Sequence, residues 1–194
     1  MSRLEPLSLA ELPKDLQAIM LAGEDIMGFT PNDGLIMARK PEMLNSILSL
    51  VQALYKPGAL PTEIKKLAAL MTSSASGCQY CEAHTTYGAL NHGVDPQKIE
   101  YIWEYQSHAI FTDAERIALD VARSAALVPN AVSDESFEQL KSHYNDEQIV
   151  ELVGIISLFG FLNRWNSTLK TDIEATPKQA ISALKGTVSS KQLN

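Results

Sequence analysis

Apolar residues recur at helical spacing along almost the whole chain, and this periodicity constrains the fold more than any other feature. Positions three or four apart lie on one face of an α-helix. Apolar stripes of this kind run over residues 9–20, 43–55, 64–75, 117–125 and 149–162. No stretch has the alternation with period two that a half-buried β-strand requires. We therefore predict an all-α fold.

Turn and capping residues set the expected ends of these helices. Pro57-Gly58 ends the second stripe, because proline and glycine both interrupt a helix. Ser76 and Gln79 form the S-x-x-Q pattern of a capping box, in which the serine side chain accepts a backbone N–H group at the helix start. We predict that a helix begins there. Other starts are predicted at Thr62, Thr112, Ser133 and Asn145.

The length of the chain and the pattern of its C-terminal part predict one domain. The 194 residues fall within the roughly 100–200 residues of a single domain, and no internal stretch has the composition of a linker. The stripe that ends at Leu162 is apolar nearly all round, so we expect a central, buried helix there. A last short helix is predicted over 177–184. We predict a single helical domain over residues 1–186 and a loose tail over 187–194.

The charge of the chain argues against nucleic acid as a partner, and the length of its apolar runs argues against a membrane. The net charge is -7 and the basic residues are scattered, whereas nucleic-acid binding requires clustered lysine and arginine. The longest apolar run, 153–162, is far shorter than the roughly 20 residues that span a bilayer. The first residues lack the apolar stretch of a signal peptide. We expect a cytoplasmic protein that binds neither nucleic acid nor membranes.

The two cysteines of the chain, Cys78 and Cys81, are three residues apart, and His84 follows three residues later. On a helix this spacing brings Cys78 to Cys81 and Cys81 to His84. A disulfide between cysteines this close would constrain almost none of the chain, and in a cytosolic protein such a pair is typical of redox or metal chemistry. The sequence therefore predicts a chemical role for this segment.

Of the two thiols, we predict that Cys81 attacks first. Both sulfurs lie near a helix start, where the helix dipole stabilises a thiolate by about 0.3–1 kcal/mol. His84 can in addition take the proton of Cys81 or hold its thiolate as an ion pair. We therefore expect the pKa of Cys81 to lie below the ordinary thiol value of about 8.5. Cys78 is then the resolving thiol.

Two other interpretations of the cysteine pair remain open. A zinc site would use Cys78, Cys81 and His84, but it needs a fourth ligand and no second cysteine pair exists. The candidates for that ligand are His92, His108 and His143. Alternatively, both cysteines are inert core residues. We predict no resident metal and no cofactor other than a Cys78–Cys81 disulfide.

Two blocks of sequence resemble a known family. They are Glu63-Ile-Lys-Lys-Leu-Ala with Gly77-Cys78-Gln-Tyr-Cys81-Glu-Ala-His84-Thr85, and Ala114-Glu115-Arg116-Ile-Ala-Leu-Asp120 with Phe159-Gly-Phe-Leu-Asn163-Arg164-Trp165-Asn166. Together they resemble the carboxymuconolactone decarboxylase and alkylhydroperoxidase D-like superfamily, over roughly residues 40–175.

The resemblance implies an oligomeric helical fold and thiol-dependent reduction of peroxides. In the branch with the cysteine pair it implies that the second cysteine, Cys81, attacks. The family's relay glutamate usually precedes the first cysteine by twelve residues, where this chain has Lys66. Glu63, one helical turn earlier, is our candidate for the relay acid. The true decarboxylases of the superfamily generally lack the pair, so its presence argues against their chemistry.

The sequence as a whole thus predicts a thiol peroxidase of the alkylhydroperoxidase D-like type. Cys81, Cys78, His84 and Glu63 are the predicted catalytic residues. A hydroperoxide oxidises Cys81, Cys78 condenses with it, and an external dithiol or a lipoyl- or thioredoxin-like reductant restores the pair. A homo-oligomer is expected. The alternatives are a decarboxylase-like lyase, a disulfide reductase, or a non-catalytic redox or zinc-binding module.

Overall fold

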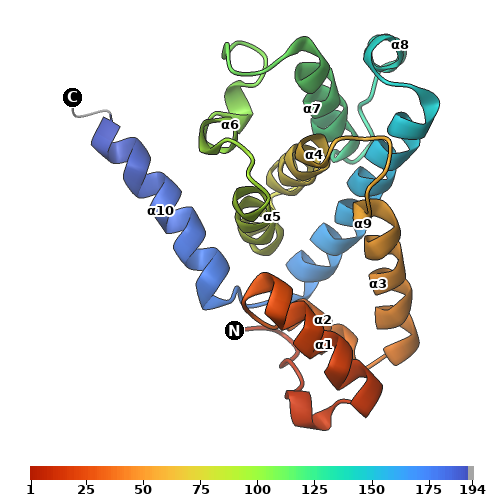
Figure 1. Cartoon of the computed structure of the whole chain (residues 1–194), viewed down its shortest axis with the longest axis vertical. Coiled ribbons are helices and arrows are strands. Elements are labelled where there is room, and N and C mark those ends of the chain that lie inside the picture. Colours follow the sequence, from red (N-terminus) through yellow and green to blue (C-terminus); the bar gives the residue numbers. More distant parts are fainter. Residues whose placement is uncertain (192–194) are drawn as a thin grey trace.

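The computed structural model describes the backbone of residues 1–191 and the side chains of 1–25 and 27–184, and within this range it contains helices and no strand. The elements are η1 (Leu9–Glu11), α1 (Lys14–Met27), α2 (Asn32–Met37), α3 (Pro41–Tyr55), α4 (Thr62–Ala75), α5 (Gln79–Asn91), α6 (Pro96–Glu100), η2 (Ile102–Glu104), α7 (Asp113–Ala125), α8 (Asp134–His143), α9 (Asp146–Leu169) and α10 (Ala175–Lys191), where η marks a 3-10 helix. The predicted all-α fold is confirmed (Figure 1).

Side-chain caps begin α7 and α9 where the sequence predicts them. Thr112 Oγ1 accepts the N–H of Glu115 at 3.2 Å, and the Glu115 carboxylate accepts the N–H of Thr112 at 2.9 Å. Asn145 and Gln148 exchange the same pair of bonds, each at 3.0 Å. These boxes satisfy N–H groups that a helix start leaves unpaired. The predicted start at Thr62 is one residue off, because Pro61 is the capping residue of α4.

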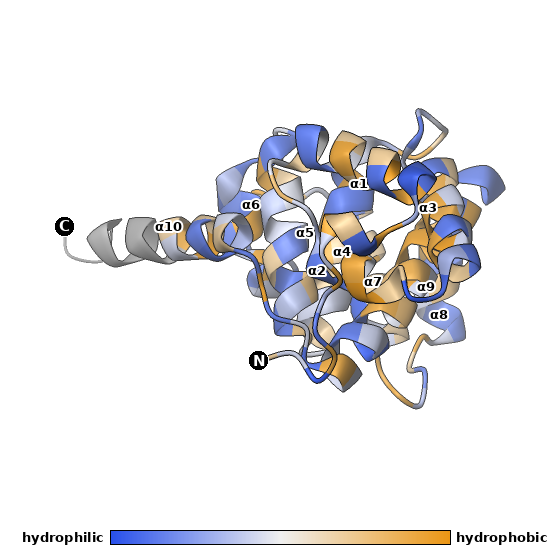
Figure 2. Ribbon diagram, turned by 90° about the horizontal axis from the view of Figure 1, so that it is seen from below, coloured by the Kyte–Doolittle hydropathy of each residue, from blue (hydrophilic) through white to orange (hydrophobic). Residues whose placement is uncertain are grey.

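Helix α4 lies in the middle of the molecule, with α5, α7 and α9 packed around it (Figure 1). The main core forms where these helices meet, and the most hydrophobic parts of the ribbon gather there (Figure 2). Met71, Leu152 and Ile155 are fully buried in this core. Each such side chain contributes roughly 1.5–3 kcal/mol through burial. A second, smaller core joins η1, α1, α2 and α3.

Helix α9 is central, but it is not buried all round as the sequence predicts. The side that faces α4, α5 and α7 is buried, whereas Val150, Val153 and Phe161 on the same helix are 71 %, 41 % and 38 % exposed. The prediction fails because the neighbouring helices cover only part of the circumference of α9. An apolar strip is therefore left at the surface.

The N-terminus packs against the end of α9 and the segment that connects α9 with α10. Met1 N lies 3.0 Å from the Asp172 carboxylate, and the Arg3 N–H donates to Leu169 O at 2.7 Å. From this junction α10 extends along one side of the molecule and contacts α5 and α6 (Figure 1). The helix predicted over 177–184 is longer and takes in residues 187–191 of the predicted loose tail, since no helix-breaking proline follows Pro177. Residues 192–194 of that tail lie outside the described part.

Candidate active site

The cysteine segment begins at a tight junction between α4 and α5. Gly77 has a φ of +67°, a left-handed conformation that glycine adopts without steric cost. It lets the N–H groups of Gly77 and Cys78 turn back to Ser74 O and Ser73 O, at 3.1 and 3.2 Å. This is a Schellman end for α4, so the next helix can begin only after it. The predicted cap at Ser76 is therefore wrong, and Cys78 is the capping residue of α5.

The junction brings the two sulfur atoms together. Cys78 Sγ and Cys81 Sγ are 2.9 Å apart, and Cys78 Sγ also accepts the backbone N–H of Cys81 at 3.3 Å. Both thiols are free and nearly completely buried. A disulfide bond is about 2.05 Å long. The sulfurs thus need to approach by less than about 1 Å to form one.

Electrostatics places the thiolate on Cys78. The thiol of Cys81 donates to Cys78 Sγ, and this bond, helped by the N–H groups of Cys81 and Tyr80 and by the Ser167 side chain, outweighs burial and lowers the pKa of Cys78 to about 6. The pKa of Cys81 is raised by that same bond, then by burial and by the charges of Cys78 and Asp33. The lowered pKa is therefore that of Cys78, whereas the sequence predicts it for Cys81. The reason is that Cys78, rather than a residue before it, caps the helix.

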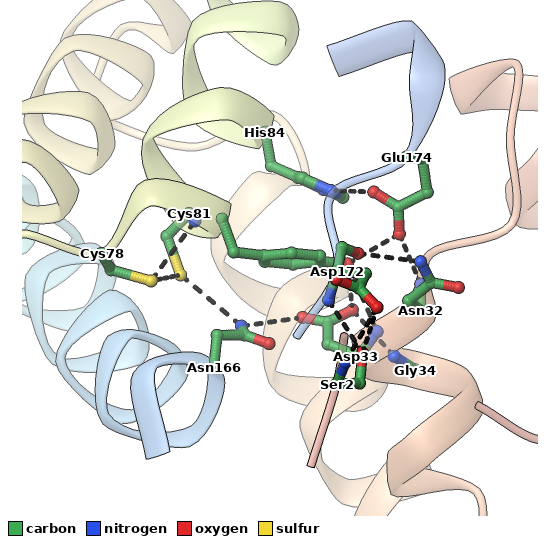
Figure 3. A network of polar contacts seen from close by, with 11 residues as sticks. Ser2, Asn32, Asp33, Gly34, Cys78, Cys81, His84, Asn166, Asp172 and Glu174 are labelled. Atoms are coloured by element: carbon green, nitrogen blue, oxygen red, sulfur yellow. Dashed lines mark hydrogen bonds and ion pairs between the residues drawn. The ribbon is translucent and has the colours of Figure 1, made fainter. Parts of the chain in front are cut away.

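His84 points away from the sulfurs (Figure 3). Its Nε2 lies 2.6 Å from Glu174 Oε2, its ring stacks on Tyr80 at 4.1 Å, and Phe29 packs edge-on against it at 5.1 Å. The described residues include no hydrogen bond between His84 and Cys81. The predicted contact is therefore wrong. The ion pair with Glu174, which no sequence motif connects with His84, holds the imidazole away from the sulfurs.

A chain of contacts still connects His84 with Cys81. The Tyr80 hydroxyl lies 3.0 Å from Glu174 Oε1 and 3.2 Å from Asp33 Oδ1. Asn166 Nδ2 donates to Asp33 Oδ2 at 3.2 Å and to Cys81 Sγ at 3.5 Å (Figure 3). Burial, and then the charges of Asp33 and Glu174, raise the pKa of Tyr80, so its hydroxyl stays a donor.

Sequence reasoning did not single out Asp33, Asn166 and Glu174 for this site. They come from α2, α9 and the segment before α10, at least 45 residues away from the cysteines in the chain. Asn166 lies in the second block that carries the family resemblance, which is the one signal that pointed to it. Asp33 and Glu174 are surrounded by no motif.

Glu63 is not brought to the cysteines. Its carboxylate pairs with Lys98 Nζ at 2.8 Å, and Lys98 in turn pairs with Glu115 at 2.5 Å. Glu63 is at the start of α4 and the cysteines follow the end of that helix, so about 18 Å of helix axis separates them. Lys66 is directed elsewhere as well, with Nζ 4.3 Å from the centre of the Tyr55 ring.

No metal centre is assembled in the part of the chain that the structure describes. Within it, no group of three or more His, Cys, Asp or Glu side chains is arranged to hold an ion. His84 turns to Glu174, and His92 Nδ1 bonds Gly88 O at 2.8 Å. The three-ligand set of the zinc interpretation therefore does not converge. Over the same range, no helix is long and apolar enough to cross a bilayer.

Comparison with known proteins shows the family of this chain. The model of the carboxymuconolactone decarboxylase family matches residues 41–124. The debrominase Bmp8 is 32 % identical, with a TM-score of 0.85 over 93 % of this chain and 96 % of Bmp8. The chain belongs to the carboxymuconolactone decarboxylase family. The resemblance read from the two sequence blocks is confirmed for this family.

Other known proteins are similar over more than half of the chain. A peroxidase-related protein from Ralstonia eutropha JMP134 is 24 % identical, with a TM-score of 0.80 over 91 % of this chain and 94 % of its own. YdfG of Bacillus subtilis is 28 % identical over 57 % of this chain and 74 % of YdfG. A Cys-to-Ala variant of Bmp8 in complex with 2,3,4-tribromopyrrole has a TM-score of 0.86 and 31 % identity over 93 % of this chain and 96 % of Bmp8. The proteins similar to this chain thus include an enzyme, the debrominase Bmp8, and a protein described as peroxidase-related.

Proposed function

We propose that this protein is a thiol peroxidase that reduces hydroperoxides with the Cys78–Cys81 pair. The observation that carries the proposal is the geometry of the pair: two buried free thiols with sulfurs 2.9 Å apart. One sulfur is a thiolate near neutral pH, since the pKa of Cys78 is about 6. A thiolate beside a second thiol is the arrangement that two-electron reduction requires.

The reaction begins with Cys78, in contrast to the order expected from the sequence. Its thiolate attacks the distal oxygen of R–O–O–H, the O–O bond breaks, and the leaving alkoxide takes a proton to become the alcohol. Cys78 is then a sulfenic acid. The sulfur of Cys81 attacks Cys78, water leaves, and a disulfide forms. An external dithiol returns both thiols, so each cycle consumes one hydroperoxide and one dithiol.

Asn166 stabilises the second step. When Cys81 attacks, it must become more negative, and Asn166 Nδ2 already lies 3.5 Å from its sulfur. Asp33 holds that amide in place at 3.2 Å. An amide has no proton to pass on at neutral pH, so the path from His84 through Tyr80 to Asn166 positions the site rather than conducting protons. His84 thus acts as a positioning residue.

The test is hydroperoxide consumption with dithiothreitol as reductant. We expect turnover by the wild type and none by Cys78→Ser or Cys81→Ser. In Cys81→Ser the sulfenic acid on Cys78 cannot be resolved, so dimedone should label Cys78 after one equivalent of peroxide. Label on Cys81 in Cys78→Ser, with none on Cys78 in the other variant, would reverse the roles. Absence of turnover by the wild type would remove the peroxidase proposal.

A second candidate function is reductive dehalogenation, which is favoured by the likeness to the debrominase Bmp8 over nearly the whole chain. The Cys78 thiolate would take the halogen from R–X, and the carbanion would gain a proton. Cys81 would then displace halide from Cys78 and form the same disulfide, so two thiols convert R–X to R–H and HX. Bromide release from 2,3,4-tribromopyrrole without peroxide turnover would favour this function.

The same assays separate the remaining alternatives. A lyase or a disulfide reductase consumes no peroxide, and a zinc-binding module would carry stoichiometric zinc in the purified protein. We also propose that the protein works in the cytoplasm, with a dithiol such as a lipoyl group or a thioredoxin-like protein as its reductant. Such a compartment keeps the pair reduced between turnovers.

A further inference from the structure

A cavity of about 610 Å³ lies next to the cysteines, between the end of α4 and helices α7, α8 and α9. Its volume is within the range of roughly 300–1,000 Å³ typical of small-molecule sites. Ser76, two residues before Cys78, forms part of its wall. Ser167, from α9, forms another part and is also a hydrogen-bond donor to the Cys78 sulfur. The wall of the cavity therefore adjoins the reactive thiolate.

The lining of this cavity combines apolar residues, uncharged polar residues and a single charge. Val121, Val132, Phe137 and Ile156 form apolar parts of the surface, and among the described lining residues none is acidic. The one charged lining residue is Arg164 on α9, which is exposed. Its Nη1 donates to Gly160 O at 3.1 Å, and within the described residues it forms no ion pair.

We infer that this cavity binds the substrate of Cys78, and that the substrate is an apolar molecule carrying a carboxylate, such as the hydroperoxide of a fatty acid or of an arylalkanoic acid. The apolar walls bury the hydrocarbon part, and the Arg164 guanidinium pairs with the carboxylate, for which its planar fork of donors is suited. The assignment of a hydroperoxide group to this substrate rests on the proposed function. The assignment of an apolar carboxylate does not, because it follows from the lining alone.

The charge of the whole molecule strengthens the case for a specific cation. A net charge of -7 disfavours anions near the protein in general. Arg164 reverses this locally at the cavity, with no acidic lining residue to cancel its charge. A carboxylate is thus favoured in this cavity, and a neutral molecule of the same shape gains only the apolar contacts.

Binding of a matched pair of unreactive probes tests the inference without catalysis. The probes are 4-phenylbutyrate and 4-phenylbutan-1-ol, with affinity measured by calorimetry on the reduced wild type. We expect the carboxylate to bind about tenfold more tightly, the ratio that one charge-assisted hydrogen bond supplies. Arg164→Gln should remove this preference and leave the alcohol unchanged. Arg39→Gln makes the same charge change at an exposed position outside the cavity and should have no effect.

A variant that fills the cavity tests its location. Ser157 is an exposed lining residue on α9, so Ser157→Trp adds bulk there with little risk to the core, and it should weaken both probes. Leu21→Trp, at an exposed apolar position on α1 outside the cavity, is the control. Light scattering checks that each variant keeps its oligomeric state. Equal affinity for the two probes, or equal effects of Arg164→Gln and Arg39→Gln, would overturn the inference.

Kinetics then separate this inference from the proposed function. For a fatty-acid hydroperoxide, Arg164→Gln should raise KM about tenfold and leave kcat unchanged, whereas turnover of hydrogen peroxide should not change. If the carboxylate probe binds as expected but no hydroperoxide is consumed, the peroxidase proposal fails and the cavity assignment stands. If hydroperoxides are consumed without any preference for carboxylates, the cavity assignment fails and the peroxidase stands.

Discussion

At the scale of single residues, the position of Cys78 at the start of α5 decides which thiol is reactive. A capping side chain accepts backbone N–H groups, and here the acceptor is sulfur, 3.3 Å from the N–H of Cys81. These donors favour the charged form of Cys78. Besides Cys78, the Cys81 sulfur has Asn166 as a hydrogen-bond partner, at 3.5 Å. The S–H group of Cys81 donates to the Cys78 sulfur, and this bond favours the protonated form of Cys81. The geometry thus favours the thiolate form of Cys78 over that of Cys81.

This separation predicts a pH profile for alkylation. Because the pKa of Cys78 is about 6, the fraction of thiolate rises as the pH passes that value from below. Iodoacetamide should therefore react at Cys78 with a half-maximal rate near pH 6, and Cys81 should stay unlabelled up to pH 8. Peptide mapping by mass spectrometry over pH 4.5 to 8 checks both statements.

His84→Ala is the informative control for this profile. If His84 activates a thiol directly, as its spacing predicts, its removal should move the midpoint to higher pH. The structure gives the histidine Glu174 as a partner instead, 2.6 Å away, so we expect the midpoint to move by less than about half a unit. A larger rise of the midpoint in His84→Ala would show that His84 activates the thiol directly.

At the scale of elements, Glu63, the candidate relay acid, belongs to an ion-pair network between helices. Lys98, in α6, joins Glu63 at the start of α4 to Glu115 in the first turn of α7. The two carboxylates outweigh burial and raise the pKa of Lys98, so this network is a charged one. Its work is structural, because about 18 Å of helix axis lies between it and the cysteines.

Substitutions in this network should therefore affect stability and spare activity. Glu63 is 43 % exposed, so Glu63→Gln should cost roughly 0.2–1 kcal/mol and leave peroxide turnover unchanged. Glu115 is buried, and Glu115→Gln should cost roughly 1–3 kcal/mol, since a buried charge then loses its nearest partner. Urea unfolding measures both. A large loss of turnover in Glu63→Gln, with stability intact, would support Glu63 as the relay acid.

Capping residues predicted most helix ends from the sequence. The contact between His84 and Glu174 shows why the surroundings of the cysteines could not be predicted in the same way. The boxes at Thr112 and Asn145 involve neighbours in the chain, so sequence alone located them. At the α4–α5 junction two local signals compete, and the left-handed Gly77 prevails over the box at Ser76. The partner of His84 is 90 residues away, and periodicity contains no information about such pairs.

Glu174, in the segment that precedes α10, should stabilise the fold in a way that depends on pH. Burial opposes ionisation of Glu174, but the hydrogen bond and charge of His84 and the N–H of Asn32 prevail and lower its pKa. The stabilisation is thus present above the ordinary glutamate value of 4.5 and is lost as the pH falls below it. Glu174→Gln should lower Tm at pH 7 and converge with the wild type below pH 4. A constant difference in Tm across this range would contradict this pH dependence.

At the scale of the whole molecule, the exposed apolar strip of α9 is the feature that a monomer does not explain. Val150, Val153 and Phe161 lie on one helix, and Leu50 of α3, the helix packed against α9, is 43 % exposed. Apolar residues gathered on one surface are typical of protein interfaces. The family resemblance also implies an oligomer. We propose that copies of this chain associate through the α9 strip.

Charge placed in this strip should dissociate the assembly without unfolding the chain. Val150 is 71 % exposed in the single chain, so Val150→Glu costs the isolated fold little, but in an interface it buries an unpaired carboxylate. We expect light scattering to give a multiple of 21.3 kDa for the wild type and the single mass for Val150→Glu, with similar circular dichroism. Leu21→Glu, at an exposed apolar position on α1, is the matched control. If Leu21→Glu dissociates the protein and Val150→Glu does not, the interface lies on α1, and the α9 strip needs another explanation.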